Sequence, residues 1–226
     1  TQDLTDPEGH GTYVYELLKE TAPDADIYML KCFDSSISLT QNEQGDAEEQ
    51  SKAPDTGSAI MQAVYDAVDV YDADIINMSW TLNQDNEELH EAMTYAAGRN
   101  VLLVAAAGNL SLSTPLGSEV YPAVWKEVIG VSGADLNEQG EPVSSLWYLQ
   151  SDAVFVSADG NYQGEKGSSF AAPRISGILA GYLDRTSEEK HTQSYAEEYL
   201  KSIAADAGQP GYDTVFGWGY VKNTAG

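Results

Sequence analysis

Short apolar runs alternate with stretches of helical spacing along this chain. Four of the runs read as strands, and they lie at residues 26–33, 73–80, 101–109 and 126–134. Residues 55–71 and 86–100 carry apolar positions at helical intervals between them. Because the runs are apolar on both faces, we expect strands that helices cover on both sides. The alternation predicts an α/β fold with a mostly parallel sheet, in which sites form at the carboxyl ends of the strands.

The remaining stretches predict a loop, a hairpin and a further helix. Residues 34–55 are polar and acidic without periodicity, and we expect a long surface loop there. Residues 212–226 have the aromatic residues and glycines of a short closing hairpin. Residues 171–183 read as a buried helix with two serines at its start, and Pro173 is expected in its first turn, where the missing N–H removes no helical hydrogen bond. No repeat is evident, so residues 1–226 are predicted to form a single domain.

The composition argues against several classes of function. The chain has 226 residues with 11 basic and 36 acidic side chains, a formal net charge of −25. This charge argues against binding to nucleic acid or to an anionic membrane surface, and mainly indicates solubility. The apolar runs are too short to span a bilayer, and no signal peptide opens the sequence. Cys32 reads as a core thiol, and without a Cys/His cluster we expect no metal site and no cofactor.

Three polar residues stand where they would suit catalysis. His10 lies between glycines at a predicted helix start, as a general base would, although alone it reads as a loop or capping histidine. Asn109 ends a buried strand and has an amide that can donate to an oxyanion, although alone it reads as a turn residue. Ser169 starts a helix and lies in the field of its dipole, although alone it reads as an N-cap.

Taken together and in this order, the three residues carry a family resemblance. The matching motifs are "GHGT" at His10, "ADIINMSW" at 73–80, "NVLLVAAAGN" at 100–109, "GSSFAAPRISG" at 167–177 and "FGWGYV" near the end. The chain resembles the subtilisin-like serine proteases, the subtilases, over most of its length. The resemblance implies a three-layer subtilisin-like fold and peptide-bond hydrolysis by a Ser-His-Asp mechanism. It implies that Ser169 is the nucleophile, His10 the base and Asn109 the oxyanion donor, together with the Ser169 backbone N–H.

The resemblance also implies which residues bind substrate. They lie at two strand ends and beside the nucleophile, and they are Ser79, Trp80, Thr81, Ala106, Ala107, Gly108 and Ser168. The first three form an edge that should pair with an extended substrate backbone. The next three should wall the pocket for the residue before the scissile bond. Three positions depart from the family pattern, because Ser168 replaces a threonine but keeps the hydroxyl, Phe170 replaces a methionine and Thr81 replaces a glycine.

The aspartate of the family's triad is missing from its expected place. In the family it ends a central strand a few dozen residues before the histidine, whereas only nine residues precede His10. Asp3 and Asp6 read as solvated loop carboxylates. We therefore expect the first strand to be absent from this chain, which leaves two neighbouring strands with unpaired backbone groups. The Asp and strand could come from an omitted N-terminal segment or from a partner polypeptide, or the acid could be lost in a pseudoprotease.

The sequence thus predicts a serine endopeptidase that acts on polypeptides through an acyl-enzyme, with the Asp supplied from outside this chain. The alternative is a catalytically inactive subtilase-like protein that binds peptides or partner proteins. An esterase of unrelated fold is disfavoured because no G-x-S-x-G motif is present. The resemblance implies a secreted or cell-surface location, and an intracellular one is compatible. The family's calcium site is not carried over, because the stretch after His10 is short.

Overall fold

The computed structural model of the protein describes residues 5–33 and 56–222. Its helices are α1 (His10–Thr21), α2 (Thr56–Asp69), α3 (Glu87–Ala97), α4 (Ser168–Asp184) and α5 (Gln193–Ile203), with a 3-10 turn at Glu188–Lys190. Its strands are β1 (Ile75–Met78), β2 (Leu102–Ala106), β3 (Val128–Leu136), β4 (Pro142–Val143), β5 (Val156–Asp159), β6 (Asn161–Tyr162) and β7 (Glu165–Lys166). The helices and strands predicted between residues 55 and 134 are confirmed, with shorter bounds except for the last strand, which begins and ends two residues later than predicted.

The main sheet is mostly parallel, as predicted. Its parallel strands lie in the order β1, β2, β3, β5, and β4 pairs antiparallel with the end of β3. Ile75 lies opposite Leu102, and Ala106 lies opposite Val131. Strands β6 and β7 form a small hairpin just before α4. The carboxyl ends of β1 and β2 therefore meet at one edge of the sheet, which is where the candidate residues lie.

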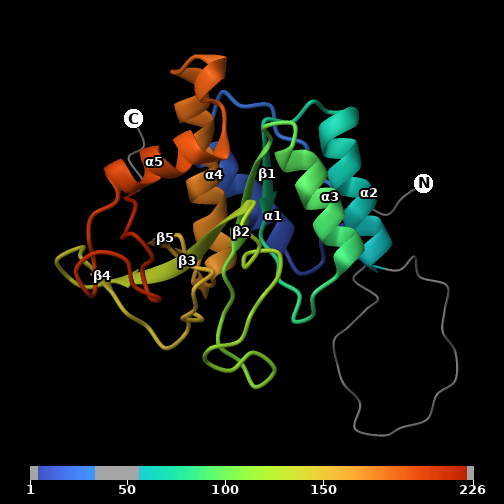
Figure 1. The fold of residues 1–226 in the computed structure, drawn as a ribbon. Coiled ribbons are helices and arrows are strands. Elements are labelled where there is room, and N and C mark those ends of the chain that lie inside the picture. The colour runs from blue at the N-terminus through green and yellow to red at the C-terminus, as the bar shows by residue number, and fades with distance from the viewer. Residues whose placement is uncertain (1–4, 34–55, 223–226) are drawn as a thin grey trace, which may run out of the picture.

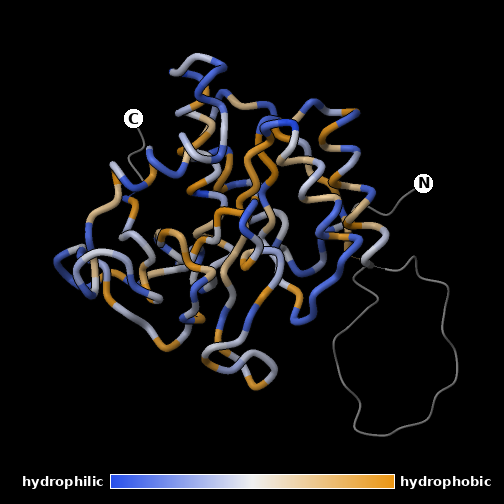
Figure 2. Tube along the Cα trace, in the orientation of Figure 1, coloured by the Kyte–Doolittle hydropathy of each residue, from blue (hydrophilic) through white to orange (hydrophobic). Residues whose placement is uncertain are grey.

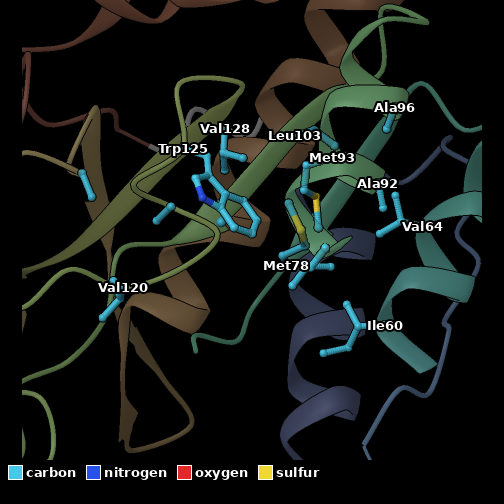
Figure 3. Close-up of a cluster of buried hydrophobic side chains, with 14 of the residues drawn as sticks. Ile60, Val64, Met78, Ala92, Met93, Ala96, Leu103, Val120, Trp125 and Val128 are labelled. Carbon is cyan, nitrogen blue, oxygen red and sulfur yellow. The ribbon is translucent and has the colours of Figure 1, made fainter. Parts of the chain in front are cut away.

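Helices cover both faces of the sheet, so the fold has three layers (Figure 1). Helices α2 and α3 pack on one face. Figure 3 shows their core, in which Ile60 and Val64 of α2 and Met93 of α3 lie with Met78 of β1 and Leu103 of β2. Alternate residues of the strands face the opposite core, under α4 and α5. Figure 2 shows hydrophobic residues concentrated along the central strands, which explains why they read as continuous apolar runs.

Helix α1 packs closely against α4. Val14 and Leu17 are the buried residues of α1, which lies against α4. Gly177 of α4 faces Thr21 at the end of α1, and a Cβ at Gly177 would overlap the Thr21 side chain. The contact thus requires a glycine for reasons of space. It fixes the position of α1, and with it His10 at the other end of that helix.

The strand predicted at residues 26–33 is wrong. These residues form no strand in the structure, and Tyr28, Met29 and Phe33 are exposed. Cys32 is partly buried in this irregular segment, so it is not the strand core thiol that we expected, and burial raises the pKa of its thiol to about 11. An apolar run becomes a strand only when a neighbouring strand offers hydrogen bonds, and none of the described residues does so here.

Three further expectations have different outcomes. The loop predicted at residues 34–55 lies outside the described residues. The predicted closing hairpin is reduced to a tight turn, closed by reciprocal backbone hydrogen bonds between Asp213 and Gly217. Pro173 is the sixth residue of α4 and not in its first turn, so it does remove one helical hydrogen bond. No helix in the described part of the chain is long and apolar enough to cross a membrane.

Candidate active site

His10 begins α1 and lies beside the residue that follows Ser169. Gly9 precedes the helix with φ 73°, a conformation that favours glycine, and its carbonyl accepts from Tyr13 N at 3.0 Å. The His10 ring packs against the Phe170 ring at 5.7 Å between centroids. Burial lowers the pKa of His10, although the charges of Asp6 and Glu8 oppose the shift. The imidazole is therefore neutral at neutral pH, the form that can accept a proton.

Asp6 holds the first turn of α1 and does not bond to His10. Its carboxylate accepts from Thr12 N at 2.7 Å and from Thr12 Oγ1 at 2.8 Å. Burial opposes its ionisation, but the hydrogen bonds from Thr12 and Gly9 outweigh that effect, and the pKa of Asp6 lies below its usual value. Asp6 is exposed, as expected of a loop carboxylate, but it also caps the helix that carries His10. Asp3 lies outside the described residues.

Ser168 and Ser169 begin α4 and have different surroundings. Ser168 is fully buried, and its hydroxyl accepts from Gly108 N at 3.1 Å. Ser169 is half-buried, and within the described residues its hydroxyl has no hydrogen-bond partner. No hydrogen bond joins Ser169 to His10 in the structure. Hydrogen bonds of catalytic groups are often long before substrate binds, so the geometry leaves both groups available for reaction.

Asn109 is held beside the start of α4 by its side-chain oxygen. Oδ1 accepts from the backbone N–H of Ser168 at 2.9 Å. Because a backbone N–H can only donate, this bond identifies the oxygen and leaves Nδ2 as the donor of the amide. Gly108, with φ 97°, turns the chain immediately before Asn109. The Asn109 amide is thus hydrogen-bonded to Ser168, the residue that directly precedes the candidate nucleophile, and its N–H₂ group is available as a donor.

A partly buried chain of polar side chains reaches Ser169 from β1, and the sequence analysis did not predict it. Ser176 Oγ donates to Asn77 Oδ1 at 3.0 Å, and Asn77 Nδ2 donates to Ser79 Oγ at 3.0 Å. Ser79 Oγ then donates to the Ser169 carbonyl at 2.8 Å. That carbonyl would normally accept from the N–H four residues later, but Pro173 stands there and has none. The polar residue inside the apolar run at 73–80 was the signal for this network.

The predicted substrate edge has unused backbone groups. Beyond Ser79, the backbone groups of Trp80 and Thr81 have no hydrogen-bond partner among the described residues, whereas Leu82 pairs with Tyr121 in both directions. Both residues are half-buried, and the Trp80 ring lies edge-on to Phe33 at 5.9 Å. An extended peptide could therefore add its own hydrogen bonds here.

The predicted pocket walls are closed in this structure. Ala106 and Ala107 are fully buried and Gly108 is buried with them. A Cβ at Gly108 would come within 3.2 Å of Val120 and of Leu149, so these two side chains already fill the space beside it. Whether these three residues wall a substrate pocket stays a prediction.

No metal site is evident around these groups. In residues 5–33 and 56–222, no three His, Cys, Asp or Glu side chains gather as ligands of one ion. The other two histidines lie away from α1 in chain and fold. His90 of α3 stacks on Trp125 and contacts Glu127 at 3.1 Å, and His191 bonds to the Thr186 carbonyl.

The comparisons with known proteins point to one family. The family model described as Peptidase_S8, Subtilase family, matches residues 2–219. The minor extracellular protease Epr of Bacillus subtilis (strain 168) is 30% identical over 244 residues, covering 100% of this chain and 34% of that protein. An intracellular serine protease of Paenibacillus polymyxa is 29% identical over 200 residues, covering 79% of this chain and 56% of that protein. The chain thus spans between about a third and just over half of these two relatives.

A solved structure supports the fold. The crystal structure of a lanthipeptide protease superposes with a TM-score of 0.70 at 22% identity, covering 96% of this chain and 74% of that one. At this identity the likeness shows the fold alone. The three-layer arrangement with its mostly parallel sheet is therefore shared with a known protease structure.

Proposed function

Since the chain belongs to the subtilase family, we propose that it is the peptidase domain of a serine endopeptidase that cleaves polypeptides. Ser169 is the nucleophile, His10 the general base and Asn109 the oxyanion donor. The observation that carries the proposal is the hydrogen bond from Ser168 N to Asn109 Oδ1, which holds the amide donor beside Ser169. Residues 1–226 are proposed to belong to this one domain.

The proposed reaction proceeds in two steps. Ser169 Oγ attacks the scissile carbonyl while His10 takes its proton, and the carbonyl oxygen becomes an oxyanion that accepts from Asn109 Nδ2 and the Ser169 N–H. His10 then gives its proton to the leaving amine as the peptide bond breaks, which leaves the acyl group on Ser169. Water attacks this ester with His10 again as base, and the acid product leaves. The lowered pKa of His10 supports its role as a base.

The substrate backbone is proposed to lie along Ser79, Trp80 and Thr81. The unpaired backbone groups of Trp80 and Thr81 support this placement. Ser79 contributes through its hydroxyl, which fixes the Ser169 carbonyl. Ala106, Ala107 and Gly108 are proposed to contribute the wall behind the scissile bond, with Ser168 fixing Gly108 N. Because Val120 and Leu149 lie against Gly108, the space there suits only a small side chain.

We propose that a segment outside this chain supplies the triad aspartate on an additional strand. Two observations support it. Strand β1 pairs only with β2 among the described residues, so its other edge is open. Residues 26–33 run without strand pairing and expose Tyr28 and Met29 at 56% and 49%. A strand inserted beside β1 would pair the open edge, and its carboxyl end would bring an acid toward the His10 end of α1.

One observation favours the alternative, a peptide-binding protein without activity. No carboxylate of the described residues bonds to the His10 ring. Without such a partner the imidazolium formed during reaction is not stabilised, and the rate falls by about 3 × 10⁴-fold, a value established on subtilisin itself. The unpaired edge at Trp80 and Thr81 would then serve binding only.

The relatives leave the location open, because one is named as extracellular and another as intracellular. We propose a secreted or cell-surface location. The strongly acidic composition, with a net charge of −25, favours solubility and is compatible with this location.

The proposed function is tested by hydrolysis. The intact protein, with any segment that accompanies residues 1–226, should cleave casein and fluorogenic peptides, and the Ser169→Ala and His10→Ala variants should not. Equal cleavage by the wild type and Ser169→Ala would rule out Ser169 as the nucleophile. Absence of cleavage by the wild type, with peptide binding retained, would favour the inactive alternative.

A further inference from the structure

A tight hairpin stands immediately before the two serines that begin α4. Strands β6 and β7 form it, and because Tyr162 pairs with Glu165, the turn consists of only Gln163 and Gly164. Both turn residues have positive φ, 51° and 89°, as a two-residue turn that matches the twist of its strands requires. The chain therefore enters α4 from a short segment of well-defined shape.

The hairpin is fixed to three other parts of the fold. Lys166 Nζ donates to Asp135 Oδ2 of β3 across 2.7 Å, as an ion pair. Arg174 of α4, which is 7% exposed, donates from Nη2 to the Asn161 carbonyl at 3.1 Å. Trp147, in the segment between β4 and β5, donates from Nε1 to the Lys166 carbonyl at 3.1 Å. These contacts hold the hairpin in place without any contribution from α1.

Tyr162 is the residue through which the hairpin contacts α1. Its hydroxyl donates to Glu16 Oε2 at 2.9 Å, and its ring lies edge-on to Tyr13 with 5.6 Å between centroids. The Phe170 ring of α4 lies 6.3 Å from the Tyr162 ring and 6.4 Å from the Tyr13 ring. All three distances are in the range in which aromatic rings attract one another. The three rings thus form an aromatic cluster where the hairpin, α1 and α4 meet.

The aromatic cluster is connected to the proposed base and to the proposed nucleophile. Phe170 packs on the His10 ring at 5.7 Å between centroids and is 4% exposed, and it directly follows Ser169. Tyr13 lies one helical turn after His10 in α1. In residues 5–33 and 56–222 no carboxylate bonds to the His10 ring, so its packing on Phe170 is the contact that limits its orientation there.

We propose that Tyr162 is a positioning residue that holds His10 in place beside Ser169. It acts through Tyr13 and Phe170 and takes no part in the bonds that form and break. The proposal rests on the proposed function, because it takes the base and the nucleophile from there. A small displacement of a catalytic group lowers kcat by roughly 10- to 100-fold, so loss of Tyr162 should have an effect of this size. KM should change little, since the proposed substrate edge at the end of β1 is unaltered.

The first measurement needs no catalysis. The His10 ring is followed by NMR through a pH titration of the intact Ser169→Ala protein, and its signal is assigned by its loss in His10→Gln. Burial lowers the pKa of His10, and Tyr162→Ala should admit water to the ring and so raise that pKa. The charges that act on His10, those of Asp6 and Glu8, are the same in both proteins. An unchanged pKa of His10 in Tyr162→Ala would overturn the proposal.

Kinetic measurements on the protein with an intact Ser169 separate positioning from a purely structural role. Tyr162→Ala should lower kcat with little change in KM. Tyr162→Phe keeps the ring and loses only the bond to Glu16, so it should recover most of kcat. Glu16→Gln still accepts from the Tyr162 hydroxyl and should match the wild type. The matched control is Tyr15→Ala, which removes an exposed tyrosine of the same helix and should leave kcat and the pKa of His10 unchanged.

Tyr162→Leu keeps apolar volume and replaces Tyr162→Ala if the latter does not fold. It should still lower kcat more than Tyr162→Phe does, and equal kcat in these two variants would contradict the proposal. So would a rise in KM at unchanged kcat, or equal losses of kcat in Tyr162→Ala and Tyr15→Ala. Failure of the proposed function is seen separately, as absence of cleavage by the wild type while the pKa of His10 still rises in Tyr162→Ala.

Discussion

The hydroxyl of Ser79 donates a hydrogen bond to the backbone carbonyl of Ser169 across 2.8 Å. The two residues are 90 positions apart in the sequence, and the bond joins the end of β1 to the first turn of α4. It replaces the helical hydrogen bond that Pro173 cannot make. The candidate nucleophile is thus positioned by a side chain from the neighbouring strand as well as by its own helix.

This relationship predicts a coupling between Ser79 and Pro173. Ser79→Ala leaves the Ser169 carbonyl without its donor and should lower the free energy of unfolding by about 1–3 kcal/mol. Pro173→Ala restores an N–H at the position that bonds to the Ser169 carbonyl in a regular helix. In the Pro173→Ala background, Ser79→Ala should therefore lower the free energy of unfolding clearly less than it does in the wild type. Urea unfolding of the four proteins measures the coupling, and additive effects of the two substitutions would contradict it.

Asn109 should act through its amide donor. Asn109→Asp keeps an oxygen for the Ser168 N–H but removes Nδ2, so the variant should fold and lose kcat by roughly 10²–10³-fold, a range established on subtilisin itself. KM should change much less, because the oxyanion exists only in the transition state. Asn109→Ala should lose kcat similarly and also lose stability, since Ser168 N is left unpaired. An Asn109→Asp variant with unchanged kcat would exclude the donor role.

The packing of α1 on α4 should control activity from a distance. Gly177→Ala places a methyl group against Thr21 and should destabilise the protein by about 1–3 kcal/mol. It should also lower kcat, because displacement of α1 moves His10. Gly181→Ala is the matched control in the same helix. Its Cβ would meet only the end of the Arg185 side chain, at 3.1 Å, which can move aside. Thermal unfolding and kcat should distinguish the two, and equal effects would argue against the helix contact.

The acid limb of the pH profile should respond to charge near His10. The negative charge of Glu8 favours protonated His10 and raises its pKa. Glu8→Gln therefore lowers the pKa of His10, and the base stays neutral to lower pH. The acid limb of kcat/KM should move down by a few tenths of a pH unit, since an exposed charge acts weakly. Glu138→Gln should not move it. A shift to higher pH in Glu8→Gln would contradict His10 as the titrating base.

The sequence pattern predicted correctly those strands that have a partner strand in the structure. The prediction was wrong for residues 26–33, which have no partner strand among the described residues. The apolar runs at residues 73–80 and 101–109 contain β1 and β2, which pair with each other in the sheet. The sheet buries their apolar side chains between the helix layers. Residues 26–33 are as apolar but do not pair. The local sequence pattern shows which side chains prefer to be buried. Whether a segment forms a strand also depends on a second segment that pairs with it. The motifs led to His10, Asn109 and Ser169, but the bonds of Ser79 and Asn77 to that site depend on the three-dimensional contact of β1 with α4.

The central claim is that Ser169 is an activated nucleophile, and an intact-mass measurement tests it most directly. The purified protein and the Ser169→Ala variant are each treated with a fluorophosphonate probe and denatured. Their intact masses are then measured by mass spectrometry. The account predicts one adduct on the wild type and none on the variant, together with a further polypeptide in the same spectrum wherever the additional strand is a separate segment. No adduct on the wild type, or an adduct that persists in Ser169→Ala, would contradict it.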